Sequence, residues 1–203
     1  MNQQAEDSPD RAPRGAAVLR EGVTSSIRQG LLHELAEHGY ARTSIEAVAR
    51  RAGVGKAAIY RRWSSKLDLV VAVLSATALQ VTDTPDTGDL AGDLLAFLRS
   101  ARRLLEDPLA RRIIPDLIAE AGRQPELAAV LHDTVAGPRR ELGRQVVQRA
   151  IDRGELRADL DVGLALDLVP ATVYWRVSVR RSALPDDELE RLAHAVAAAL
   201  AAL

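Results

Sequence analysis

The chain has 203 residues, of which 47 % are apolar and 27 % charged, so it has enough apolar material for a folded core and is not an extended disordered protein. It contains no cysteine, which excludes disulfides, thiolate metal sites and a cysteine nucleophile and is typical of a reducing cytoplasm. The net charge of −1 conceals an asymmetry, because residues 1–66 carry a net +4 and residues 67–203 a net −5. This pattern is typical of a basic nucleic-acid-reading module on an acidic body, and charge alone equally fits a fluctuation along an arginine-rich chain.

The N-terminal stretch, residues 1–17, is polar and contains two prolines, and it predicts a disordered tail rather than a signal peptide. Apolar residues then recur every four positions from Leu19 to His38, which predicts an amphipathic helix that ends at Gly39. No apolar run reaches the roughly 18 residues of a membrane span, so no membrane partner is expected.

Two short helices joined by Gly53-Val54-Gly55 are predicted next. Thr43 opens the first, and Glu46 completes a capping box. The second runs from Lys56 to Trp63, and Ser65 caps a fourth helix that continues to about Val81. Helix, small turn and helix make a helix-turn-helix, whose second helix fits the major groove of DNA. We expect Val54, Ile59 and Trp63 to pack inward and Lys56, Tyr60, Arg61 and Arg62 to face outward.

The segment from Thr43 to Leu69 resembles the TetR family of bacterial transcriptional regulators, whose pattern here is close to T-s-I-x-x-I-A-x-x-A-G-V-s-x-x-t-L-Y-x-h-F-x-s-K-x-x-L. The resemblance is specific over about residues 20–70 and looser beyond, although residues 153–184 look like one common TetR-type C-terminal domain. The chain departs from the pattern at Gly55, where a Ser or Thr cap is usual, and at Ala57 and Ala58, which reduce hydrogen-bonding capacity.

The resemblance implies a set of DNA-binding residues. Tyr60 and Lys66 match positions that contact the phosphate backbone, while Arg61 and Arg62 are left to read bases together with thymine-methyl contacts from alanine. Thr43 and Ser44 lie at a helix N-terminus that favours a phosphate, although Thr43 can equally be a cap alone. The predicted DNA-binding residues are Thr43, Ser44, Lys56, Ala57, Tyr60, Arg61, Arg62 and Lys66.

Three motifs that suggest other chemistry fail on spacing or context. His33 and His38 are five residues apart, whereas a helical zinc site needs histidines four apart. The run from Gly53 to Ala58 can be written G-x-G-x-x-A, but a dinucleotide site needs a preceding strand, and a helix is predicted there. A phosphate loop fails as well, because Arg50 stands where its first glycine should be. No catalytic residue, metal site or cofactor is therefore predicted, and the chain is not expected to be an enzyme.

Five further helices are predicted in the remaining chain. One starts at Asp107-Pro108, and the others cover about 89–106, 125–153, 161–183 and 185–203, with starts signalled by Asp89, Pro125, Asp161 and Pro185. Pro115, Pro138 and Pro170 lie inside these patterns and predict kinks, which either leave room for a small molecule or only bend helices around a filled core. The expected effector-pocket residues are Phe97, Arg102, Tyr174, Trp175 and Arg176; one of the adjacent Tyr174 and Trp175 is expected to face the pocket and the other the dimer seam.

The sequence thus predicts an all-α protein of about nine helices, with a disordered tail (1–17), a helix-turn-helix domain (18–66) and a C-terminal bundle (67–203). The function implied by the resemblance is a cytoplasmic, homodimeric repressor that binds a near-palindromic operator, dimerises through its last two helices and releases DNA when a small effector binds. Two alternatives stay open: an all-α carrier or enzyme with an incidental basic module, and a TetR-like regulator controlled by a protein partner.

Overall fold

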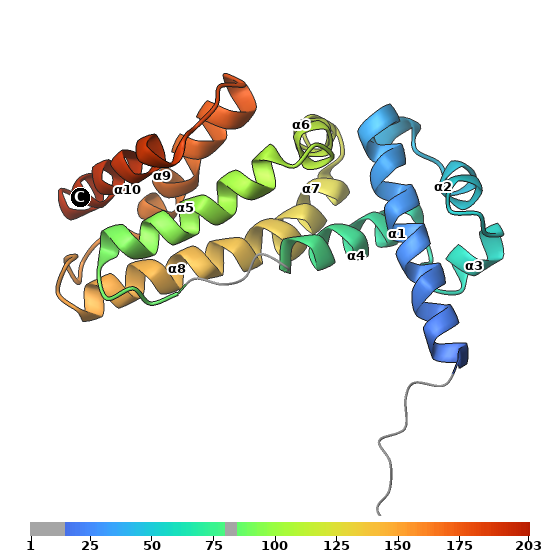
Figure 1. The fold of residues 1–203 in the computed structure, drawn as a ribbon, viewed down its shortest axis with the longest axis horizontal. Helices are drawn as coiled ribbons and strands as arrows, with labels where there is room; N and C mark the ends of the chain where they lie inside the picture. Colours follow the sequence, from blue (N-terminus) through green and yellow to red (C-terminus); the bar gives the residue numbers. More distant parts are fainter. Residues whose placement is uncertain (1–14, 80–84) are drawn as a thin grey trace, which may run out of the picture.

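The computed structural model describes residues 15–79 and 85–203, and within these ranges every regular element is a helix (Figure 1). The all-α prediction is confirmed. The predicted tail at residues 1–14 and the predicted loop and helix end at residues 80–84 lie outside the described residues.

The first four helices are α1 (Gly15–Arg42), α2 (Ile45–Arg51), α3 (Lys56–Tyr60) and α4 (Lys66–Leu79). Residues 15–17, predicted as tail, belong to α1. The helix is interrupted at Gly39, whose φ of 75° and ψ of 168° are not helical, and this confirms the predicted end of the first amphipathic helix. Ser65 caps α4 as predicted, since its hydroxyl accepts a hydrogen bond of 3.0 Å from the N–H of Asp68.

The remaining α-helices are α5 (Leu90–Glu106), α6 (Ala110–Ala121), α7 (Pro125–Leu131), α8 (Gly137–Asp152), α9 (Val162–Tyr174) and α10 (Asp186–Ala201). Asp89 and Asp161 cap α5 and α9 with their carboxylates, as predicted. Asp107 accepts hydrogen bonds of 2.9 Å from the N–H groups of both Leu109 and Ala110, so α6 begins at Ala110 rather than at the predicted proline.

Two predicted helices contain a wider, π-helical turn. The helix predicted from Pro125 to Arg153 passes through η1 (His132–Ala136) on its way from α7 to α8. An α-helix would set the ring of Pro138 against the carbonyl four residues earlier, and Pro138 has no N–H to donate. The π-turn, where Gly137 donates instead to the carbonyl of His132, accommodates the proline.

The second π-turn, η2 (Trp175–Val179), ends the helix that begins at Val162. The chain leaves it through Arg181, whose φ of 53° lies in the left-handed region. The helix predicted to continue to Ala183 is therefore shorter than the periodicity suggested, because a left-handed residue cannot continue a right-handed helix.

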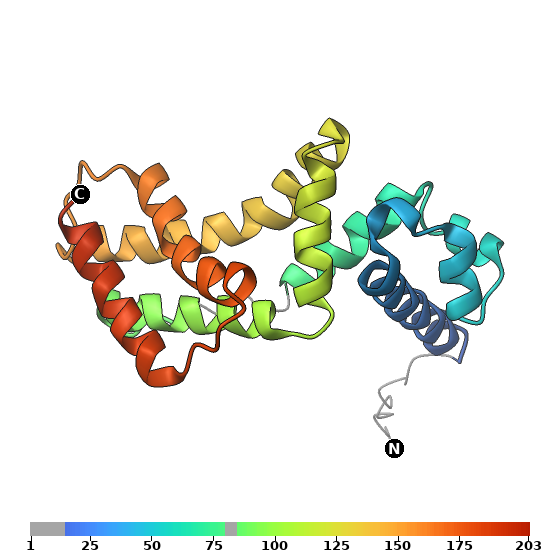
Figure 2. The same ribbon diagram turned by 90° about the horizontal axis from the view of Figure 1, so that it is seen from above.

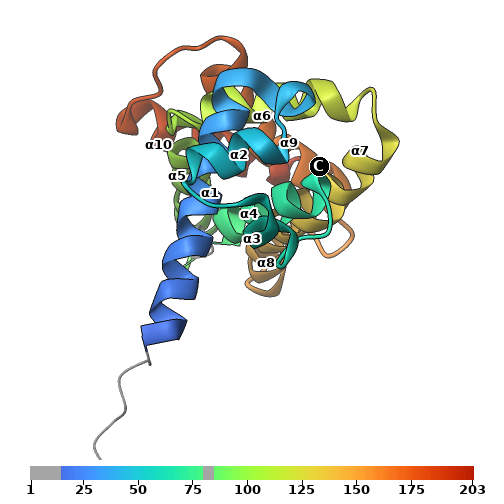
Figure 3. The ribbon, with the colours of Figure 1, turned by 90° about the vertical axis from the view of Figure 1, so that its right-hand side faces the viewer.

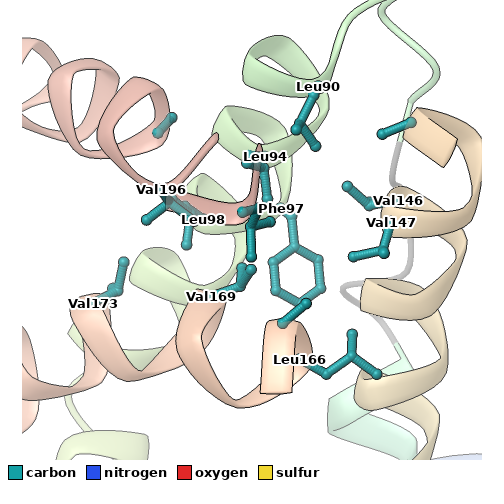
Figure 4. Close-up of a cluster of buried hydrophobic side chains, with 14 of the residues drawn as sticks. Leu90, Leu94, Phe97, Leu98, Val146, Val147, Leu166, Val169, Val173 and Val196 are labelled. Atoms are coloured by element: carbon teal, nitrogen blue, oxygen red, sulfur yellow. The ribbon is translucent and has the colours of Figure 1, made fainter. Parts of the chain in front are cut away.

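Buried apolar side chains form two clusters. One joins α5, α8, α9 and α10 around Phe97 (Figure 4). The other joins α1 to α4 and continues onto Ile113 and Leu117 of α6. Since α4 contributes Leu69, Val70 and Val73 to this second cluster, α4 packs with the N-terminal helices, although the predicted division at residue 66/67 assigns it to the C-terminal domain.

The two clusters lie along an elongated molecule. Seen from above, α6 runs crosswise between α1 and the long helices of the body (Figure 2). The α2–α3 pair occupies one end, where it faces the viewer in Figure 3, and α9 and α10 lie at the opposite end.

Candidate nucleic-acid interface

The turn between α2 and α3 is fixed by backbone hydrogen bonds. Val54 donates to the carbonyl of Ala49 at 3.0 Å and Gly53 to that of Arg50 at 3.3 Å, the paired bonds of a Schellman cap. Gly53 has a φ of +67°, a conformation that glycine adopts without strain. The sequence at this turn therefore ends α2 sharply and sets the direction of α3.

Helix α3 separates an inner face from an outer one. Ile59 is 0 % exposed and belongs to the N-terminal cluster, against which Val54 and Trp63 are partly buried. The side chains that face solvent are Lys56, Ala57, Tyr60 and Arg61, and Tyr60 is 53 % exposed. The predicted division of this helix into a buried and a cationic face is confirmed for these residues.

The N-cap of α2 is Ser44, whose hydroxyl accepts a hydrogen bond of 3.1 Å from the N–H of Ala47. The predicted cap, Thr43, is wrong by one residue. Thr43 is 3 % exposed, and its hydroxyl donates to the carbonyl of Gly39 at 2.8 Å. Its hydroxyl therefore links the chain back to the α1 kink and is not available to a phosphate.

Lys56 and Glu46 form an ion pair of 2.8 Å across the turn, with both side chains more than half exposed. The hydrogen bond from Lys56 holds the pKa of Glu46 below its ordinary value, and the same bond raises the pKa of Lys56. A solvent-exposed pair is only weakly stabilising, so Lys56 can exchange Glu46 for another anion.

Two predicted DNA-contacting cations are instead used within the protein. Arg62 donates to the Thr24 hydroxyl at 3.1 Å and to the carbonyl of Ala58 at 2.8 Å. Lys66 donates to the carbonyl of Tyr40 at 2.9 Å and lies 4.2 Å from the centre of its ring. Burial lowers the pKa of Lys66. Both side chains anchor α3 and α4 to α1, and neither extends from the outer face.

Sequence reasoning missed the ion cluster that holds α2 against α1. Arg51 bonds to Glu34 at 2.8 Å and to both carboxylate oxygens of Glu37. Glu34 is 4 % exposed. The hydrogen bond to Glu37 raises the pKa of Arg51 and lowers that of Glu37. The spacing of Glu34 and Glu37 on one helix face was the available signal, but nothing in the sequence pointed to Arg51 as their partner.

A second contact that sequence reasoning missed connects α1 to α6 of the body. The carboxylate of Asp116, on α6, accepts a hydrogen bond of 2.7 Å from the N–H of Tyr40, the residue after the α1 kink. A side chain at Gly39 would approach within 2.5 Å of that carboxylate. The glycine at the kink therefore has two effects: it interrupts the helix, and it leaves room for the Asp116 carboxylate to reach the backbone.

Comparison with known proteins identifies the family to which the chain belongs. Residues 27–73 match the family described as "Bacterial regulatory proteins, tetR family", and residues 84–196 match "Tetracyclin repressor-like, C-terminal domain". The chain belongs to the TetR family of transcriptional regulators. A DNA-binding transcriptional repressor TetR of Mycobacteroides abscessus is 33 % identical over 167 residues, 82 % of this chain and 83 % of that protein.

Two further comparisons extend over most of the chain. An HTH-type transcriptional regulator of Mycobacterium tuberculosis is 33 % identical over 161 residues, 79 % of each chain. The crystal structure of the TetR-family regulator SCO0332 superposes with a TM-score of 0.67 at 28 % identity, over 87 % of this chain and 97 % of that one. The chain is therefore a transcriptional regulator and not an enzyme.

The residues predicted to form an effector pocket divide between the apolar cluster of the body and the segment that leads into α10. Phe97 is 7 % exposed and is enclosed by Leu166 and Val169 of α9 on one side and Val146 and Val147 of α8 on the other (Figure 4). Tyr174 packs partly buried against the same cluster, whereas Trp175 is 59 % exposed.

The two arginines of that predicted pocket both bind the segment that leads into α10. Arg102 donates to the carbonyl of Leu184 at 2.6 Å and pairs with Asp186 at 2.6 Å. Arg176 donates to the carbonyl of Ala183 and pairs with Glu188 at 2.5 Å. Both guanidinium groups therefore hold the start of α10.

Proposed function

We propose that the protein is a dimeric, ligand-responsive repressor that reads DNA with the outer face of α3. The observation that carries this proposal is that Lys56, Ala57, Tyr60 and Arg61 face solvent together on a helix whose other face holds a fully buried Ile59. A helix of this kind enters the major groove, where Arg61 can reach base edges and Tyr60 and Lys56 can contact phosphates. The proposed interface leaves out Thr43, Arg62 and Lys66, and Ser44 remains a backbone-contact candidate at its rim.

A second copy of the chain is the proposed partner of the outer face of α9 and of the π-turn η2 that follows it. This face carries exposed apolar side chains at Leu164, Trp175 and Val179. The stretch Val162–Val179 is apolar and long enough to cross a membrane by length and composition, and only 28 % of it is buried. Because it also carries Asp167 and Arg176, both ion-paired, we assign the exposed apolar face to a dimer interface with α10.

Effector control is supported by the family and by fold neighbours. The regulator FadR of Bacillus subtilis, crystallised with stearoyl-CoA, superposes with a TM-score of 0.70 at 20 % identity, over 87 % of this chain and 97 % of that one. We propose that a small molecule bound in the body favours a conformer whose two α3 helices no longer fit successive major grooves. Such a ligand acts only through its different affinity for the two conformers.

Selection from a random DNA pool with the purified protein tests this function. We expect a near-palindrome whose half-sites are separated by about one helical turn, roughly 10 base pairs, because two α3 helices related by a two-fold axis enter successive grooves. Absence of any enriched sequence would contradict operator binding and favour an all-α carrier. Enrichment of an operator that no small molecule releases would instead favour control by a protein partner.

A further inference from the structure

Two arginines of the body have a buried nitrogen without a hydrogen-bond partner among the described residues, Arg102 at Nε and Arg139 at Nη1. Both Nη atoms of Arg102 are bonded, to Leu184 and Asp186, which leaves Arg139 as the arginine to explain. Arg139, in the first turn of α8, is partly buried, and its Nη1 atom is closed to solvent and has no hydrogen-bond partner among the described residues. Burial lowers the pKa of Arg139, yet a guanidinium remains charged at any working pH. The structure therefore leaves a cation partly desolvated and unpaired.

The other arginines of the described body show how unusual this is. Each is either well exposed or bonded to a carboxylate. The well-exposed ones outside such pairs are Arg103, Arg111, Arg112, Arg180 and Arg181, and the paired ones are Arg99, Arg102, Arg123, Arg140, Arg144, Arg149, Arg153, Arg157, Arg176 and Arg191. An unsatisfied buried charge is costly, so Arg139 needs a reason to be kept.

Arg139 lies on the inward stripe of its helix. Gly143, Val146 and Ala150 follow it at four, seven and eleven positions, and all three are buried. Residues with this spacing share one helix face. Gly143 lies at the wall of the apolar cluster, because a side chain there would come within 2.9 Å of Leu166 and 3.6 Å of Phe97. The Arg139 side chain thus begins one turn beyond the apolar end of that cluster.

A further unsatisfied polar atom lies on α4. The hydroxyl of Ser75, on α4, is also closed to solvent and without a hydrogen-bond partner among the described residues. Helix α4 packs against η1, the π-turn that directly precedes the first turn of α8. Two neighbouring helices therefore each bring an unused hydrogen-bonding group to this end of the body.

We propose that Arg139 and Ser75 bind the anionic head of the effector, a small organic acid whose apolar part lies toward Phe97 and Leu166. This inference rests on the proposed effector control and names the ligand's chemical class. A carboxylate or phosphate supplies the acceptor that the guanidinium lacks, and such charge-assisted bonds are the strong ones in a partly dehydrated site. Of the two arginines predicted from sequence, Arg176 is paired with Glu188 and Arg102 is bonded through both Nη atoms, and Arg139 takes their place.

Thermal unfolding of the full-length protein with a panel of small molecules tests the proposal. The panel pairs octanoate, benzoate and phenylacetate with their neutral amides and adds octyl phosphate. We expect at least one anion to raise the unfolding temperature while its neutral partner does not. Arg139→Met should weaken the binding of that anion about 10- to 100-fold. Arg139→Lys should weaken it less, and Ser75→Ala should weaken it a few-fold.

Arg144→Met is the matched control, because it removes the same charge from an exposed position on the same helix, and it should leave binding unchanged. Ligand-free Arg139→Met should also unfold at the same or a higher temperature than the wild type, since it removes an unpaired buried charge. A shift with octyl phosphate alone identifies a phosphate ligand. The proposal is wrong if no anion distinguishes wild type from Arg139→Met, or if that variant is destabilised without ligand. The operator affinity of the ligand-free protein is measured separately. It shows whether the protein binds DNA even when the anion proposal is wrong.

Discussion

Two adjacent arginines that follow α3 have different surroundings and therefore different expected roles. Arg61 is exposed, whereas Arg62 is bonded to Thr24 of α1 and to the carbonyl of Ala58. Arg61→Ala should weaken binding to the selected operator about 10- to 100-fold while binding to unrelated DNA falls much less, because a base contact contributes roughly 1–3 kcal/mol of discrimination. Fluorescence anisotropy with both DNAs measures this.

The same substitution at the neighbouring position is the control. Arg62→Ala should lower the free energy of unfolding by about 1 kcal/mol, the usual contribution of a lost hydrogen bond, and Thr24→Val should lower it by a similar amount. The double variant should lose less than the sum, since both changes remove one contact. Equal effects of the two arginine variants on operator discrimination would contradict the assignment of Arg61 as the reader.

The orientation of α3 was predictable because apolar and polar positions alternate with helical spacing around Ile59. The partners of individual cations were not, because a long side chain at the edge of a face can extend outward or fold back. Arg62 and Lys66 fold back onto α1, toward Thr24 and the Tyr40 carbonyl, and these acceptors are separated from them by 38 and 26 residues. Such long-range acceptors leave no trace in local spacing.

At the scale of elements, the two glycines of the α2–α3 turn should respond to serine in opposite directions. Gly55 caps α3 with a φ of −75° and a ψ of 149°, and no other atom lies within 4 Å of the place that a serine Cβ would take, so Gly55→Ser should stabilise the protein by a few tenths of a kcal/mol. Gly53 has a φ of +67°, so Gly53→Ser should destabilise it by about 1 kcal/mol. Urea unfolding measures the free energy of unfolding of both variants. Destabilisation by Gly55→Ser would mean that α3 does not start at Lys56.

Helix existence and most helix starts followed from capping residues, and Asp89, Asp161 and Ser65 cap their helices as predicted. The π-turns were not predictable in the same way. A proline within an apolar period signals a disturbed helix, but whether the helix kinks, breaks or widens depends on packing. At Pro138 it widens, and the resulting π-turn η1 packs against α4.

At the scale of the whole molecule, a buried carboxylate links the start of α5 to the end of α8. Asp93 is 0 % exposed and pairs with Arg149 at 3.4 Å and with Arg153 at 3.2 Å. Burial by itself would raise the pKa of Asp93, but hydrogen bonds from the N–H and hydroxyl of Thr87 and from Arg153 hold it below the ordinary value.

A carboxylate with a lowered pKa in the folded state adds stability above its unfolded pKa of about 4 and loses it as the pH falls through the folded pKa. Asp93→Asn should therefore lower the free energy of unfolding by about 2 kcal/mol at pH 7. This loss is somewhat smaller than for breaking a fully buried ion pair, because both arginines are partly exposed. Urea unfolding of both proteins across this pH range should show the difference shrink as the pH falls below about 4. A difference that is constant from pH 7 to pH 3 would show that Asp93 contributes as a neutral hydrogen-bonding group.

The proposed dimer interface predicts a charge-sensitive association. Trp175→Glu should leave the monomer folded, because the side chain is 59 % exposed, and should weaken dimerisation about 30-fold or more, as expected for a central aromatic at an interface. Ile118→Glu, at a similarly exposed apolar residue of α6 (54 %), is the control and should leave the dimer intact. Analytical ultracentrifugation of both variants measures the dimer dissociation constant. Unchanged association of Trp175→Glu would show that η2 lies outside the dimer interface.

The most direct measurement is the salt dependence of operator affinity for wild type, Tyr60→Phe and Arg61→Ala. Binding through phosphate contacts releases counterions, so the logarithm of the association constant should fall linearly with the logarithm of salt concentration. Tyr60→Phe should weaken all DNA about evenly, and Arg61→Ala should reduce the preference for the operator. Salt-independent binding, or variants of this outer face that bind both DNAs like the wild type, would contradict the conclusion that α3 reads DNA.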